Sequence, residues 1–105
     1  MTDLVIVLTT VAADARADEL ARQLVDEGLA ACVNLYPPMV STYRWKGRVE
    51  RESEQQIVSK TTRARVAALE TRLRQLHPYE LPEFVVLPVE SDSEAYVDWV
   101  RDATR

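Results

Sequence analysis

The spacing of hydrophobic and polar residues changes several times along the chain, and each change predicts a new element. A continuous aliphatic run at residues 4–8 is typical of a central strand that is buried on both faces. Residues 12–28 carry apolar side chains at helical spacing and end at Gly28, where a left-handed helix cap is expected. A second strand at residues 29–36 runs into Pro37 and Pro38, which indicates a kink at a sheet edge.

The middle of the chain predicts a long β-hairpin with a polar arm. Residues 39–45 alternate strictly, so one face of this strand presents Met39, Ser41, Tyr43 and Trp45. The pair Lys-Gly at 46–47 predicts the turn. The returning strand, residues 48–62, begins polar on both sides, and we expect its alternating glutamates at 50–54 to face solvent or pair with arginines. An arm without an apolar face is expected to project outward and to pair with another subunit.

The second half of the chain completes an α+β pattern. Residues 66–76 predict an amphipathic helix that ends by His77, because Pro78 disfavours helical geometry in the residue before it. Residues 84–90 predict another buried strand, and residues 91–105 predict a short terminal helix. The order β-α-β-β-α-β predicts a ferredoxin-like sandwich with a long β-hairpin, an extra C-terminal helix and a single domain over residues 1–105.

Composition and charge narrow the classes of function. The net charge of −4 and the pI near 5.0 argue against a protein that binds nucleic acid. No apolar run approaches the roughly 20 residues that span a bilayer, so no membrane partner is expected. The single cysteine fits a cytoplasmic location. Neither a nucleophile–base pair nor a P-loop or dinucleotide fingerprint is evident, so we expect a binding protein rather than an enzyme.

The segment HPYELPE, residues 77–83, holds the only histidine and is the first candidate site. His77 suits a divalent metal ion, Cu(II) before Zn(II), although a histidine at a helix C-terminus equally serves to satisfy the last carbonyls. A turn would bring Glu80 back toward His77, and Cys32 is the one soft ligand, although its apolar surroundings favour a core position. The predicted metal ligands are therefore His77, Glu80 and Cys32, and a neighbouring subunit would have to supply the rest.

The hairpin provides a second candidate, a ligand pocket. Tyr43 and Trp45 share a face, and Lys60 on the returning strand would add a cation for a small anion. Packing at a subunit interface is the alternative for the two aromatic residues. A lysine near the core needs a counter-charge, for which Glu80 or Glu83 is the obvious carboxylate. The predicted pocket consists of Tyr43, Trp45, Lys60 and Glu83.

Six short segments carry a resemblance to a known family. LAACVNL, STYRWKGRVE, SKTT, HPYELPE, VLPV and YVDW stand in the order and spacing of the CutA-type divalent-cation tolerance proteins, which the chain resembles from about residue 4 to 102. The resemblance implies the ferredoxin-like fold and a homotrimer in which long hairpins complete neighbouring sheets. Metal ligands suggested for the family include a cysteine and a second histidine at positions that hold Thr9 and Leu76 here, which weakens the case for that copper site.

Two functions follow as hypotheses. The first is a copper-type divalent-cation binding or tolerance protein, a homotrimer with a ligand cleft between subunits that is centred on His77 and Glu80. The alternative is a PII-like trimeric signalling or scaffold protein that binds a small anionic metabolite near Lys60, Tyr43 and Trp45.

Overall fold

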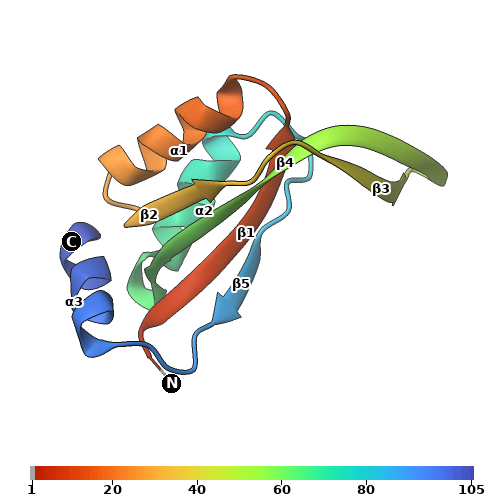
Figure 1. Ribbon diagram of the computed structural model, residues 1–105. Helices are drawn as coiled ribbons and strands as arrows, with labels where there is room; N and C mark the ends of the chain where they lie inside the picture. Colours follow the sequence, from red (N-terminus) through yellow and green to blue (C-terminus); the bar gives the residue numbers. More distant parts are fainter. Residues whose placement is uncertain (1) are drawn as a thin grey trace.

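The computed structural model describes residues 2–105 as one sheet with helices on its faces (Figure 1). The elements, in chain order, are β1 (Leu4–Ala12), α1 (Arg16–Asp26), β2 (Cys32–Leu35), β3 (Met39–Trp45), β4 (Arg48–Thr62), α2 (Val66–Leu76), β5 (Val85–Pro88) and α3 (Glu94–Ala103). Every strand pairing in this range is antiparallel, and the order across the sheet is β2-β4-β1-β5, with β3 on the outer part of β4. The predicted ferredoxin-like arrangement is confirmed. No helix within residues 2–105 is long and apolar enough to cross a membrane.

Helices α1 and α2 cover one face of the sheet and enclose the main core. Val5 and Val7 of β1 point into it, because alternate residues of a strand face the same side. Leu24 of α1 and Leu69 of α2 meet them there, each no more than 1% exposed. Helix α1 ends as predicted, with Gly28 in the left-handed region at φ +70.

The opposite face of the sheet is only partly covered. Helix α3 packs at one end of it, where Val100 contacts Leu4 in a small second core. Beyond α3, one cross-strand row brings Cys32, Lys60, Ile6 and Leu87 to this face, because directly opposed residues of antiparallel strands point to the same side. We call this surface the open face.

The hairpin of β3 and the first half of β4 projects from the body as an arm (Figure 1). Its strands pair with each other from Met39 opposite Glu54 to Trp45 opposite Arg48, while the rest of β4 pairs with β1 and β2. The predicted projection is therefore confirmed. It follows from the sequence, because an arm that is polar on both sides gains little by folding back on its own core.

One expectation about burial is wrong within the single chain. The aliphatic run at residues 84–90 predicts a buried strand, but β5 is exposed along its whole length, with Leu87 at 42%. The reason is topological, because β5 forms an edge of the sheet and pairs only with β1. Its side chains therefore lack a second layer in this chain.

Candidate functional site

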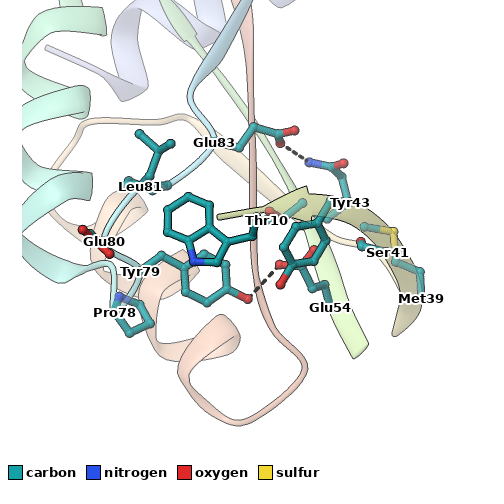
Figure 2. A pocket seen from close by; sticks show the side chains of 13 residues that line it. Thr10, Met39, Ser41, Tyr43, Glu54, Pro78, Tyr79, Glu80, Leu81 and Glu83 are labelled. Atoms are coloured by element: carbon teal, nitrogen blue, oxygen red, sulfur yellow. Dashed lines mark hydrogen bonds between the residues drawn. The ribbon is translucent and has the colours of Figure 1, made fainter. Parts of the chain in front are cut away.

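A cleft of about 900 Å³ lies between the arm and the HPYELPE segment (Figure 2). One wall is the alternating face of β3, formed by Met39, Ser41, Tyr43 and Trp45. The other wall is the segment 78–83. Thr10 of β1 and Glu54 and Gln56 of β4 complete the lining. The cleft therefore brings together residues from three separate parts of the sequence.

Local sequence explains how the two walls are held. The turn between β3 and β4 has positive φ at both central residues, Lys46 at 50 and Gly47 at 79, as a type I′ turn requires. This turn fixes the register that places Tyr43 and Trp45 on the cleft side. Across the cleft, Pro78 and Pro82 keep residues 78–83 out of regular helix or sheet.

The charge of the lining has one sign. Among the described residues, three carboxylates line the cleft and no lysine or arginine does; the carboxylates are Glu54, Glu80 and Glu83. An ion pair lies at the rim, where the Lys46 Nζ is 3.8 Å from the Glu80 Oε2. Both of these side chains are at least 70% exposed, so this pair is expected to contribute little to stability. A lining of this kind attracts a cation.

Glu54 is the buried carboxylate of the cleft. It is only 6% exposed, and its Oε2 accepts a hydrogen bond of 2.7 Å from the Tyr79 hydroxyl (Figure 2). Burial, reinforced by the hydrogen bond to Glu54 and its charge, raises the pKa of Tyr79 well above its usual value, so the hydroxyl keeps its proton and donates. Burial also raises the pKa of Tyr43, with further contributions from Glu52 and Glu54. Both tyrosines are therefore neutral groups beside a negative charge.

Glu83 is held at the other end of the lining. Its Oε2 accepts a hydrogen bond of 3.1 Å from the Gln56 Nε2, which also donates to the Thr9 carbonyl oxygen at 2.6 Å. The amide of Gln56 therefore ties β1, β4 and the segment 78–83 together. The sequence-based prediction that Glu83 lines a pocket with Tyr43 and Trp45 agrees with this geometry.

His77 has a structural role in this chain. It is 7% exposed and does not line the cleft. Its Nδ1 accepts a hydrogen bond from the Tyr79 backbone N–H, so its Nε2 carries the proton that is donated to the Thr10 carbonyl oxygen at 2.7 Å. Both ring nitrogens are engaged, and a metal ion would have to displace one of these bonds. The alternative interpretation was partly right: His77 caps α2, but its ring bonds β1 rather than the last helix carbonyls.

The three predicted metal ligands do not converge. Glu80 lines the cleft, His77 is buried behind it, and Cys32 lies half-buried in β2 on the open face. The Cys32 Sγ is 4.0 Å from the Asn34 Oδ1. Within residues 2–105, no group of three or more His, Cys, Asp or Glu side chains is placed to hold a metal ion. Within the described residues, His77, Glu80 and Cys32 therefore do not form one metal site.

Lys60 is also separated from the cleft. It lies on the open face and lines a smaller cavity of about 250 Å³, together with Asp92 and Tyr96. Its predicted pairing with Glu80 or Glu83 is not formed within the chain, since Glu80 pairs with Lys46 and Glu83 accepts from Gln56. Of the predicted pocket, Tyr43, Trp45 and Glu83 are brought together and Lys60 is not.

Several residues of the cleft are not indicated by the sequence, Glu54, Gln56 and Tyr79 among them. The alternation of the arm predicts that Glu54 faces solvent, and no local pattern points to a role for Tyr79. The one available signal was the position of Glu54, three residues before Ile57, where the polar half of the strand gives way to the apolar half. Glu54 is the arm residue flanked by strands on both sides, at Met39 and Ala12, and Tyr79 covers its side chain.

Comparison with known proteins gives a consistent picture. The family model "CutA1 divalent ion tolerance protein" matches residues 5–103. The divalent-cation tolerance protein CutA of Thermus thermophilus is 42% identical over 99 residues, which cover 94% of this chain and 96% of that protein. A solved structure of the Thermus thermophilus protein matches with a TM-score of 0.93, covering 97% of this chain and 99% of the other.

Two further solved structures differ in how they are described. The CutA of Nostoc sp. is called PII-like; it is 41% identical and has a TM-score of 0.91, with 96% of this chain and 97% of that chain covered. The CutA of Archaeoglobus fulgidus is called a periplasmic divalent cation tolerance protein; it is 25% identical, with a TM-score of 0.93 and coverage of 97% and 99%. Relatives of this chain are thus described under more than one role, and one of them is described as periplasmic.

Proposed function

Because the chain belongs to the CutA family of divalent-cation tolerance proteins, we propose that it is a homotrimeric, non-enzymatic cation-binding protein whose ligand site is the cleft described above. The observation that carries the proposal is the sign of the lining: three glutamates and no basic residue among the described residues. A binding site for a small anion would show the opposite charge. Cu(II) is the first ion to test and Zn(II) the second.

The cleft as formed by one chain offers too few ligands for a tightly held metal ion. Cu(II) and Zn(II) prefer nitrogen, sulfur and carboxylate ligands in groups of about four. Glu54 and Glu80 would each provide an oxygen, and a neighbouring subunit would provide the remaining ligands. The proposal therefore makes metal binding dependent on assembly, with the cleft lying between subunits.

Two exposed apolar surfaces support assembly with further copies of the chain. The edge strand β5 exposes Val85, Val86 and Leu87, and the arm exposes Val40 and Val49 at 60% and 64%. Both the arm and β5 have unpaired backbone edges, which readily accept another strand. We propose that each arm lies along a neighbouring subunit, and that this contact closes the open side of the cleft.

The second candidate function is PII-like binding of a small anionic metabolite, which the description of the Nostoc relative suggests. The charge of the cleft disfavours it, because Lys60, its expected cation, lies in another cavity. For an anion, the cleft would need Lys60 from a neighbouring subunit. Cellular location is a separate proposal: the lone cysteine favours the cytoplasm, and fractionation of cells decides between this and the periplasm described for the Archaeoglobus relative.

Two measurements test the proposed function. Light scattering at micromolar concentration is expected to give three times the 11.9 kDa mass of the chain, and a monomer would overturn the shared cleft. Titration calorimetry with Cu(II) and Zn(II) is expected to show binding that weakens at least about tenfold in Glu54→Gln and Glu80→Gln. The matched control is Glu90→Gln, an exposed glutamate outside the cleft. Equal Cu(II) affinity in all variants would exclude the cleft as the metal site.

A further inference from the structure

The structure already holds one ammonium group at the mouth of the cleft. The Lys46 Nζ lies 5.6 Å from the centroid of the Trp45 ring and 3.8 Å from the Glu80 Oε2. A cation within about 6 Å of an indole centroid is attracted by the negative face of the ring. The Lys46 side chain is 70% exposed, so these two contacts are weak and easily exchanged. Trp45 and Glu80 therefore form a pair suited to a positively charged nitrogen.

Deeper in the cleft, a second negative group lacks a cation. Glu54 is 6% exposed and accepts a hydrogen bond from Tyr79, but it pairs with no lysine or arginine in the part of the chain described. Water stabilises the charge of a largely buried carboxylate only in part, and a counter-ion compensates for the loss. The Tyr79 hydroxyl donates to one oxygen of Glu54, and the other oxygen is left to the open cleft. The carboxylate is therefore prepared for a positive ligand group.

The size and the chemistry of the walls distinguish between kinds of cation. A volume of about 900 Å³ lies at the upper end of the range for sites that hold small organic molecules and far exceeds the space of a bare ion. Tyr43, Trp45, Met39 and Leu81 offer aromatic or apolar surface, which a hydrated metal ion does not use. Aromatic rings combined with carboxylates are the usual means of recognising alkylammonium groups.

We infer that the cleft binds an organic ammonium ion, with Trp45 and Tyr43 against its alkyl groups and two carboxylates, Glu80 at the mouth and Glu54 deeper, as its counter-charges. The inference rests on the proposal that the cleft is the ligand site and names a second class of ligand for it. Lys46 then acts as an internal competitor, which occupies the Trp45–Glu80 pair until a ligand nitrogen takes its place. A neutral molecule of the same size binds more weakly, because it gains neither the ring attraction nor the charge pair.

The chain offers a direct way to observe such binding. It has two tryptophans, of which Trp45 lines the cleft and Trp99 is 48% exposed on α3. In Trp99→Phe, fluorescence reports on Trp45 alone. Titration of this variant, freed of metal by chelation, with tetramethylammonium chloride at constant ionic strength is expected to give a saturable change. tert-Butanol, a neutral probe of similar size, is expected to give none.

Variants then locate the bound cation, with affinity followed by methyl chemical-shift titration of the probe. Trp45→Leu and Glu54→Gln are each expected to weaken binding of tetramethylammonium about tenfold. The amide oxygen introduced by Glu54→Gln still accepts from Tyr79, so this variant retains the fold. The controls Trp99→Leu and Glu90→Gln are expected to bind as the wild type. Lys46→Asn removes the competing ammonium, keeps a residue that tolerates positive φ, and is expected to tighten binding about threefold.

The outcomes separate this inference from the proposed function. Binding of tetramethylammonium that is lost in Trp45→Leu but retained in Trp99→Leu supports the inference, even if Cu(II) and Zn(II) do not bind. Cu(II) binding that depends on Glu54, together with no saturable binding of tetramethylammonium, overturns the inference and leaves the proposed function intact. Equal affinity for tetramethylammonium in wild type and Trp45→Leu also overturns it, since the indole would then have no part in binding.

Discussion

The two halves of β4 belong to one strand and differ in almost every physical respect. Ile57, in the inner half, is fully buried and pairs with β1 and β2, whereas Val49, in the arm, is 64% exposed and pairs only with β3. Backbone hydrogen bonds to a neighbouring strand hold both halves, so pairing alone does not make a core. Burial comes from the layer of helices that covers the inner half alone. Glu54 lies at the junction where the two halves of β4 meet. It is polar, like the residues of the arm, and buried, like those of the inner half.

The largest expected difference between the halves is in their contribution to stability. Ile57→Ala leaves a cavity in the core and is expected to lower the free energy of unfolding by about 2–5 kcal/mol. Val49→Ala is expected to lower it by less than about 1 kcal/mol, because the side chain already faces solvent in the single chain. Denaturant titration of both variants at one protein concentration checks this. A loss at Val49 as large as that at Ile57 would contradict the comparison.

The next largest effect on stability is expected from the hydrogen bond between Tyr79 and Glu54, where the two halves of β4 meet. Tyr79→Phe leaves the Glu54 carboxylate buried without its donor, and is expected to cost about 1–3 kcal/mol of stability at neutral pH. Thermal unfolding monitored by far-UV circular dichroism measures the loss. The control is Tyr36→Phe, which removes the hydroxyl of a residue that is 52% exposed and lies outside the cleft. If both variants melt alike, the Tyr79–Glu54 bond contributes nothing.

The same bond predicts a dependence on pH. The pKa of Tyr79 is raised in the folded protein above its ordinary value of 10.0, chiefly by burial. Below that pH the hydroxyl is protonated in both states, and its stabilising effect is fully present. As the pH rises further, the unfolded chain loses this proton while the folded chain retains it, so stability falls. The advantage of wild type over Tyr79→Phe is therefore expected to shrink between about pH 9 and 11, and an unchanged gap would contradict the raised pKa.

Whether a feature of the fold or of the cleft can be predicted from the sequence depends on how far apart along the chain the interacting residues lie. The arm and its alternating aromatic face follow from local periodicity, and the sequence predicts them correctly. The roles of His77 and Glu54 depend on partners 67 and 25 residues away, Thr10 and Tyr79, which no local pattern reveals. The exposure of β5 shows the same limit, because an aliphatic run indicates that a surface is suited to burial without indicating what covers it.

The smallest expected change in stability concerns Glu54, the residue at which the two halves of β4 meet. Glu54→Gln removes a buried charge and keeps an acceptor for the Tyr79 hydroxyl, so we expect the protein to become about 1 kcal/mol more stable. Glu52→Gln, on the same side of the exposed arm, is expected to leave the melting temperature unchanged within error. A lower melting temperature for Glu54→Gln would show that the carboxylate supports the fold. A higher one, combined with weaker binding of Cu(II) or tetramethylammonium, would mean that the charge is kept at the expense of stability. That combination is characteristic of a functional group rather than a structural one.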